Sequence, residues 1–257
     1  MCFDPDARPP IPPIAGGATE ARDRVLTSAD GTRFAAYAAR AARPSGAGMI
    51  VLPDVRGLHG YYTELALRFA EVGVDAVAID YFGRTAGIGD RGEGFDFMPH
   101  VGQTRPETIQ ADIAAAAAFL RSPDGGAVRA LFSVGFCFGG AVSFLQAASD
   151  LGYAGVIGFY GWPLGLPRWP DRPRPIDAVA RFRCPVLAIY GAADPGIPPS
   201  AVEEFDRALA RAGVPHESVS YDGAPHSFFD RRQTEFADAS ADAWRRVQAF
   251  VAAPGRA

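Results

Sequence analysis

The chain has 257 residues, of which 48% are hydrophobic and 21% charged, as in an ordinary soluble globular protein. The formal net charge is −4, which gives no reason to expect binding to nucleic acid or to an anionic membrane. All 25 basic residues are arginine, so mechanisms that require a lysine, such as Schiff-base chemistry and P-loop nucleotide binding, are excluded.

The number of cysteines and the hydropathy pattern limit the possible classes of protein further. No run of about 18 apolar residues is present, and the N-terminus is acidic, so we expect neither a membrane span nor a signal peptide. The cysteines, Cys2, Cys137 and Cys184, are few and far apart, which predicts neither a disulfide framework nor a metal site. A reducing cytoplasm is the expected location.

Strand and helix patterns alternate along most of the chain. Residues 1–20 are rich in proline and predict an extended arm, and residues 21–257 predict a single domain. Strands are expected at 25–27, 33–38, 49–53, 74–79, 128–134, 154–160, 185–191 and 217–221. Helices are expected at 61–72, 106–121, 141–148, 200–212 and 233–251, with Ser200 as a cap. Residues 84–105 and 166–175 have no clear period and are expected to be irregular. This order predicts an α/β fold with a mostly parallel central sheet flanked by helices on both faces.

The stretch 130–141 combines an apolar strand, a sharp turn and a helix-like segment. Its turn, Gly135-Phe-Cys137-Phe-Gly139-Gly140, matches the nucleophile-elbow pattern Gly-x-Ser-x-Gly with cysteine in place of serine. Cys137 would lie near a helix N-terminus, which favours its thiolate. A buried cysteine that packs in an apolar strand–helix junction would fit the same stretch.

Two further polar residues follow expected strands. Asp194 follows the strand at 185–191, and His226 follows the strand at 217–221. Nucleophile, acid, histidine is the order of the α/β-hydrolase fold, in which loops at one edge of a parallel sheet bring the three residues together. A loop aspartate and a turn histidine are common on their own, but the three residues in this order favour a catalytic triad.

The roles follow from chemistry. His226 would take the proton of Cys137 and later activate water, and Asp194 would accept the other imidazole N–H and fix its tautomer. The backbone N–H groups of Phe138 and Val55 would bind the oxyanion.

Three segments resemble the signature segments of the dienelactone hydrolase family: 135–140, 191–194 and 221–228. The Asp54 loop and residues 80–84 are similar to the family's amino-terminal half, so the resemblance covers about residues 25–252. It implies an α/β-hydrolase fold and a Cys-His-Asp hydrolase that opens a lactone or cleaves an ester through an acyl-cysteine. It implies no cofactor and a small-molecule substrate, and a monomer or a homodimer is expected.

Two positions depart from the family pattern. The founding enzymes carry a glutamate that contacts the resting nucleophile, and here Asp54 occupies its place; Asp54 could instead cap the following helix. The family arginine four residues after the catalytic histidine is replaced by Asp230, which would repel a substrate carboxylate. We therefore expect an ester or lactone other than the dienelactone, without a charge. Arg84 or Arg105 could supply an anion contact instead.

Aromatic residues near strand ends are expected to line an apolar pocket, although most such residues are simply core. The candidates are Tyr61, Tyr81, Trp162 and Phe228. A thioesterase or acyl-transfer enzyme could use the same triad, and a non-catalytic homologue could bind a small ligand in the same pocket. Thiol reactivity separates these classes, because an enzyme should carry one activated cysteine and a binding protein none.

Overall fold

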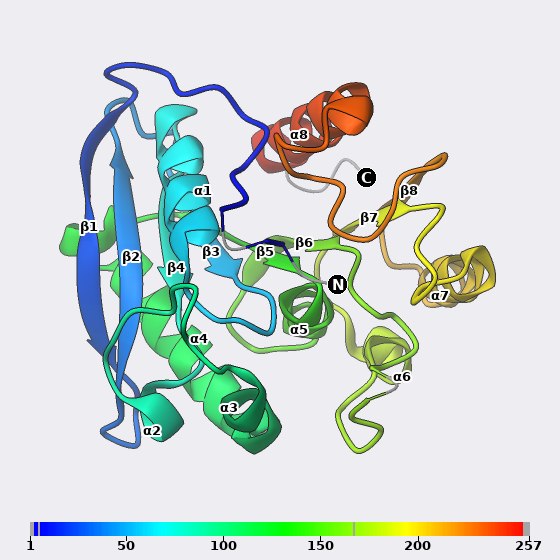
Figure 1. The fold of residues 1–257 in the computed structure, drawn as a ribbon, viewed down its shortest axis with the longest axis horizontal. Helices are drawn as coiled ribbons and strands as arrows, with labels where there is room; N and C mark the ends of the chain where they lie inside the picture. The colour runs from blue at the N-terminus through cyan, green and yellow to red at the C-terminus, as the bar shows by residue number, and fades with distance from the viewer. Residues whose placement is uncertain (1–2, 5, 167, 254–257) are drawn as a thin grey trace. The chain divides into compact units, whose positions relative to one another are not determined.

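The computed structural model describes residues 3–4, 6–166 and 168–253, so Cys2 lies outside the described residues (Figure 1). The chain divides into two compact units. We call residues 4–131 the N-terminal unit, and residues 132–257, with which residues 1–3 are grouped, the C-terminal unit. No described helix is long and apolar enough to cross a membrane.

The N-terminal unit contains a mixed sheet whose strand order is β1-β2-β4-β3. β1–β2 and β2–β4 are antiparallel pairs, and β3–β4 is a parallel pair. The strands are β1 (Ala18–Thr27), β2 (Arg33–Ala41), β3 (Ala47–Leu52) and β4 (Asp75–Ile79). The helices are α1 (Gly60–Glu71), α2 (Gly83–Ala86), α3 (Met98–Gln103), α4 (Pro106–Arg121) and the 3-10 helix η1 (Pro123–Gly125).

The strands of the C-terminal unit follow in the order β5-β6-β7-β8, and β6, β7 and β8 pair in parallel. They are β5 (Ala130–Phe136), whose first two residues belong to the N-terminal unit, β6 (Tyr153–Phe159), β7 (Val186–Gly191) and β8 (His216–Tyr221). The helices are α5 (Phe138–Gln146), α6 (Pro175–Ala178), α7 (Pro199–Arg211), α8 (Ala237–Ala252) and the 3-10 helices η2 (Val179–Arg181) and η3 (Thr234–Phe236).

Helices cover both faces of these strands, and two glycines of β6 make room for them. A Cβ on Gly155 would lie 2.5 Å from the ring of Phe250 in α8, and a Cβ on Gly158 would lie 2.3 Å from the ring of Phe144 in α5. Positions three apart in a strand point to opposite faces, so α8 and α5 pack on opposite sides of β6.

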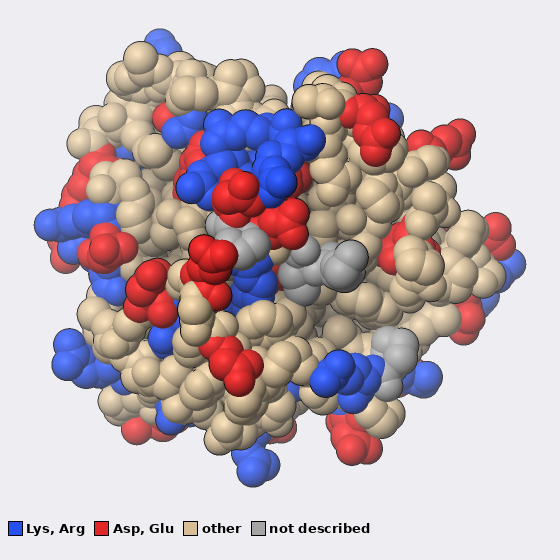
Figure 2. Space-filling view, in the orientation of Figure 1, with Lys and Arg blue, Asp and Glu red and all other residues tan. Residues whose placement is uncertain are grey.

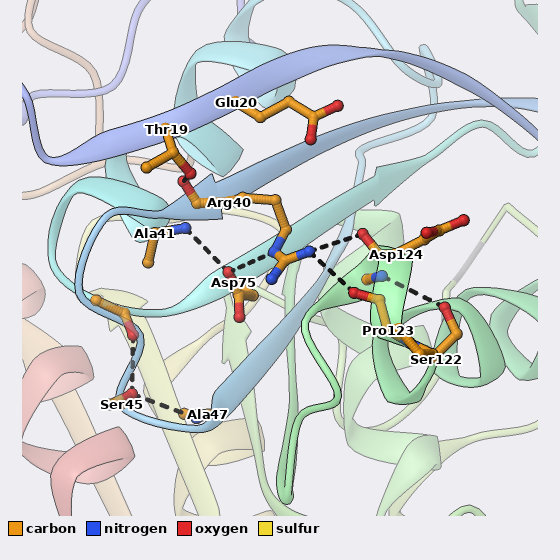
Figure 3. Close-up of polar contacts among 12 residues, drawn as sticks. Thr19, Glu20, Arg40, Ala41, Ser45, Ala47, Asp75, Ser122, Pro123 and Asp124 are labelled. Carbon is orange, nitrogen blue, oxygen red and sulfur yellow. Dashed lines mark hydrogen bonds and ion pairs between the residues drawn. The ribbon is translucent and has the colours of Figure 1, made fainter.

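A buried carboxylate at the start of β4 ties three elements of the N-terminal unit together (Figure 3). Asp75 Oδ1 accepts hydrogen bonds from Arg40 Nε and from the backbone N–H of Ala41. The same guanidinium donates to the carbonyl oxygens of Pro123 and Asp124 in η1 (Figure 3). These bonds fix the end of β2 against β4 and against the segment that leads into β5.

A second buried carboxylate, Asp80, follows the other end of β4. Its Oδ1 accepts the N–H of Leu58, and its Oδ2 accepts the N–H of Phe82 and two guanidinium N–H groups of Arg91 at 3.0 and 3.2 Å. The Arg91 guanidinium also lies 4.6 Å from the centroid of the Phe95 ring. Asp80 therefore anchors both the loop before α1 and the glycine-rich segment before α3.

Most expected elements are confirmed within a few residues, and α4 has the expected bounds. The expectation of an irregular 84–105 was wrong in part, because α2 and α3 lie there. Ser200 is not the cap of α7: that helix begins at Pro199, whose missing N–H suits the first helical position. β1 begins at Ala18, inside the segment expected to be an arm, and α8 begins at Ala237 after η3.

Charged side chains of both signs lie on the visible face of the molecule (Figure 2). The formal net charge of the whole chain is −4.

Candidate active site

Cys137 lies in a strained turn between β5 and α5. Its backbone angles are φ 56° and ψ −116°, a conformation that costs free energy in a residue with a side chain. Its N–H donates to the carbonyl of Phe159 at 3.0 Å, which ties the turn to the end of β6, and its carbonyl accepts the N–H of Gly140. Cys137 is the N-cap of α5 and is 4% exposed. The sequence pattern of the nucleophile elbow therefore corresponds to a real strained turn.

The small residues of the elbow are required by close backbone contacts. A Cβ on Gly135 would lie 1.9 Å from the carbonyl oxygen of Gly139, and a Cβ on Gly140 would lie 2.7 Å from the carbonyl oxygen of Phe159. Neither space admits a side chain, so α5 can begin directly after Cys137 only with glycine at these positions. This explains why α5 starts at Phe138, three residues before the expected start at Ala141.

The loops after β7 and β8 bring Asp194 and His226 together. His226 Nδ1 lies 2.5 Å from Asp194 Oδ2, and the two side chains are 6% and 3% exposed. Asp194 Oδ1 accepts the N–H of Gly196 at 2.8 Å, which fixes the carboxylate plane. His226 Nε2 is buried and makes no hydrogen bond among the described residues. The pair thus leaves one imidazole nitrogen available for a proton acceptor role.

The charge state of Asp194 follows from its neighbours. Burial by itself raises the pKa of Asp194, but the hydrogen bond and charge of His226 and the N–H of Gly196 outweigh burial, so the net pKa is lowered. Asp194 is therefore ionised at neutral pH, as a carboxylate that orients an imidazole must be.

Two aromatic rings flank the imidazole of His226. The ring centroids of Tyr160 and Trp162 lie 4.8 and 4.9 Å from that of His226. Tyr160, with φ 38°, and Ser227, with φ 61°, share with Cys137 the positive φ that is rare outside glycine. Three of the four non-glycine residues with positive φ in the described chain thus lie in the loops after β5, β6 and β8; the fourth, Ala127, precedes β5.

In the N-terminal unit, Asp54 is fully buried and is not the cap of α1, because His59 holds the N-cap position. Asp54 Oδ1 accepts the N–H of Arg56 at 2.8 Å. Its Oδ2 makes no hydrogen bond among the described residues and lies 3.7 Å from His59 Nε2. A buried carboxylate and a buried imidazole therefore face each other where the sequence suggested a helix cap or a thiol-modulating group.

Other candidates have structural contacts within their units. Arg84 donates to Asp30 and Asp112, an ion-pair network that holds its guanidinium. Tyr61 is fully buried, and the Tyr81 hydroxyl donates to the carbonyl of Pro53 at 2.9 Å. Val55, a candidate oxyanion donor, is 9% exposed. Phe228, a candidate pocket residue, is buried against the rings of Tyr160 and Tyr221.

One group beside the elbow was not singled out from the sequence. The Arg172 guanidinium lies 5.1 Å from the centroid of the Phe138 ring and 5.4 Å from that of Trp169. Burial lowers the pKa of Arg172. Arg172 and Trp169 belong to the segment without periodicity at 166–175, where the sequence signal is a high content of proline, arginine and tryptophan.

The two buried cysteines are expected to differ in reactivity. Burial raises the pKa of Cys184 to about 12, so its thiolate is scarce at pH 8. Cys137, at a helix N-terminus, should react with iodoacetamide well before Cys184, as peptide mass spectrometry after timed quenching would show. Equal labelling in denaturant is the control, and equal labelling of the folded protein would contradict the expectation.

The parallel β6–β8 strands, the strained turn after β5 and the His–Asp pair after β7 and β8 define the class of α/β hydrolases. Residues 34–254 match the family model described as "Dienelactone hydrolase family", and the chain belongs to that family. It is a hydrolase whose family acts on small molecules.

The chain is similar to bacterial proteins over nearly its whole length. A Salmonella typhimurium protein named "Putative carboxymethylenebutenolidase" is 29% identical, over 98% of this chain and 96% of the relative. An Escherichia coli protein of the same name is 26% identical, over 93% and 92%. The crystal structure called "Putative Dienelactone Hydrolase" from Klebsiella pneumoniae has 28% identity and a TM-score of 0.76, over 91% of this chain and 99% of that one. These likenesses confirm the α/β-hydrolase fold.

Proposed function

We propose that this protein hydrolyses a small ester or lactone through an acyl-enzyme on Cys137, with His226 as the base and Asp194 as its orienting acid. The observation that carries the proposal is the 2.5 Å contact between His226 Nδ1 and Asp194, together with a buried Nε2 that makes no hydrogen bond among the described residues. Cys137, the residue that this nitrogen would serve, belongs to the same unit and lies in the strained elbow.

Acylation begins when His226 Nε2 takes the proton of the Cys137 thiol. The thiolate sulfur attacks the substrate carbonyl carbon, and the carbonyl electron pair moves to oxygen. When the oxyanion collapses, the carbon–oxygen bond to the alcohol breaks and His226 returns its proton to the leaving alkoxide. In a lactone the alcohol remains attached to the acyl group. The products are a thioester on Cys137 and a neutral imidazole.

Deacylation uses the same groups with water in place of the thiol. His226 removes a proton from water, and the hydroxide attacks the thioester carbonyl. The carbon–sulfur bond breaks, the acid leaves, and the imidazolium proton returns to the thiolate. Asp194 stays ionised throughout, since its pKa is lowered, and it holds the tautomer in which Nε2 can accept a proton.

The N–H of Phe138, at the first position of α5, and the N–H of Val55 are the proposed oxyanion donors. The first N–H groups of a helix have no partner within the helix, and the helix dipole favours a negative charge there. Asp54 is the proposed thiol-modulating group, because its buried Oδ2 makes no hydrogen bond among the described residues.

The proposed substrate is uncharged. Asp230 stands where the family arginine would meet a substrate carboxylate, and its Oδ1 accepts the N–H of Arg232. Arg84, which with Arg105 is a candidate replacement, is engaged by Asp30 and Asp112. We expect a neutral ester to be turned over with a higher kcat/KM than the anionic dienelactone, in steady-state assays of both. Strong, saturable turnover of the dienelactone would contradict this expectation.

The remaining features of the proposal are a cytoplasmic location, a monomer or homodimer, and a single hydrolase domain over residues 21–257. The proposed chemistry requires no cofactor.

The test compares turnover of a short activated ester by the wild type and by Cys137→Ala. The variant should lose at least about 10³-fold in kcat, because it has no nucleophile. Equal turnover by both proteins would show that the thiol is not the nucleophile. If neither has activity on esters, thioesters should be tried, since the same triad suits them. Ligand binding without any turnover would favour the non-catalytic alternative.

A further inference from the structure

We propose that Trp162 is a positioning residue. It holds the side chains of Asp194 and His226 in their hydrogen-bonded arrangement and stabilises the charged form of the imidazole. Trp162 lies in the loop after β6, one residue beyond Gly161, and is half-buried. The inference rests on the proposed function, because a positioning residue requires a working His–Asp pair. All of the contacts that carry it lie within the C-terminal unit.

The first observation is a chain of two hydrogen bonds through one residue. Trp162 Nε1–H donates to the carbonyl of Gly196 at 3.0 Å, and the N–H of Gly196 donates to Asp194 Oδ1 at 2.8 Å. Gly196 therefore joins the indole to the carboxylate. A Cβ on Gly196 would lie 3.3 Å from Asp194 Oδ1 and 3.4 Å from Trp162 Cζ2, so the three groups are already in close contact.

The second observation is the position of the indole ring beside His226. The two ring centroids are 4.9 Å apart with an interplanar angle of 39°. Tyr160 lies at 4.8 Å from the same imidazole. With Nδ1 held by Asp194, these rings restrict the rotation of the imidazole and so fix the direction of Nε2.

These contacts act differently on the two charge states of His226. The face of an aromatic ring, and of tryptophan above all, attracts a nearby cation, and the attraction grows when the pair is removed from water. His226 is an imidazolium only after it has taken the proton of Cys137 or of water. The indole therefore stabilises the transition state more than the resting enzyme, which raises kcat rather than lowering KM.

The experiment uses two variants that separate the N–H from the ring. Trp162→Phe keeps an aromatic face and loses the donor to Gly196, and Trp162→Leu loses both. Trp244→Phe is the matched control, since Trp244 lies on α8, outside the loops after β6, β7 and β8. Each protein is assayed with the same neutral ester across pH, and its unfolding is measured in parallel.

We expect Trp162→Phe to lower kcat about 5-fold and Trp162→Leu about 30-fold, with KM changed less than twofold. The pH profile of kcat should change in Trp162→Leu and change less in Trp162→Phe, because the imidazolium then lacks the aromatic face of the indole. Trp244→Phe should match the wild type. A merely structural role would reduce the folded fraction and leave the shape of the pH profile unchanged.

Two results would overturn the inference: a pH profile of Trp162→Leu that superimposes on the wild type, or a rise in KM with unchanged kcat, which would make Trp162 a substrate contact. A second readout keeps the inference separate from the proposed function. The imidazole proton signals of His226 can be followed by NMR in protein without substrate. If the wild type is inactive on esters, the proposed function fails. Signals that change with pH differently in Trp162→Leu would still support the positioning role of Trp162, and unchanged signals would reject it.

Discussion

Replacing Asp194 with asparagine is expected to lower kcat about 10⁴-fold, with little change in KM. The carboxylate accepts the Nδ1–H of His226 at 2.5 Å. An asparagine can offer its amide N–H to that nitrogen instead, which selects the other tautomer and leaves a proton on Nε2, where the base must be free. Steady-state kinetics with a short activated ester measure the effect.

The matched control is a second His–Asp pair in the same unit. His216 Nε2 lies 3.2 Å from Asp206 Oδ1, and the Asp206 side chain is 46% exposed. Asp206→Asn should keep kcat within about twofold, because the pair is solvated and serves no nucleophile. If Asp194→Asn loses no more activity than Asp206→Asn, the assigned triad is wrong.

The lowered pKa of Asp194 also predicts the pH dependence of stability. A carboxyl group whose pKa is lower in the folded state stabilises the fold above its unfolded-state pKa of about 3.9, and this contribution is lost as pH falls through the folded-state pKa. The difference in unfolding free energy between the wild type and Asp194→Asn should therefore narrow as pH falls below about 4. Urea unfolding at several pH values measures it.

The largest effect on stability is expected from Asp80→Asn, at about 3–5 kcal/mol of unfolding free energy. Asp80 is fully buried, and Arg91, which it binds through two guanidinium N–H groups, is 3% exposed. The substitution leaves that guanidinium as a buried charge without its carboxylate and weakens the bonds to Leu58 and Phe82. Urea or thermal unfolding would measure the loss.

Two further variants distinguish the effect of the unpaired buried charge from a general loss of packing. In Asp80→Asn/Arg91→Met the uncompensated charge is gone, so the double variant should be more stable than Asp80→Asn alone. Asp177→Asn removes an exposed carboxylate that binds Arg174 through two hydrogen bonds, and its stability should match the wild type. An equal loss in Asp80→Asn and Asp177→Asn would contradict the role assigned to Asp80.

The fold could be predicted where local signals agree with one another. The bounds of α4 are predictable because Pro106 marks its first turn and its apolar positions repeat at helical spacing. The strand ends that carry Cys137, Asp194 and His226 were also placed well, since each follows an apolar run closed by a glycine or a turn. For that reason the sequence predicts the Asp194–His226 contact.

The rest depends on contacts between residues distant in the chain. The sequence around Arg91 does not show that its guanidinium binds Asp80. The sequence around Arg84 likewise does not show that Asp30 and Asp112 bind its guanidinium. The role of Trp162 likewise arises from a carbonyl 34 residues further along. Such partners are set by the packing of loops, which sequence periodicity does not encode.

The most direct test of the central claim is mass spectrometry of the protein quenched with acid during turnover of an activated ester. The account predicts a mass increase equal to one acyl group, located on the peptide that contains Cys137, which disappears as substrate is exhausted and is absent in Cys137→Ala. An acyl group on another residue, or turnover that persists in Cys137→Ala, would contradict it.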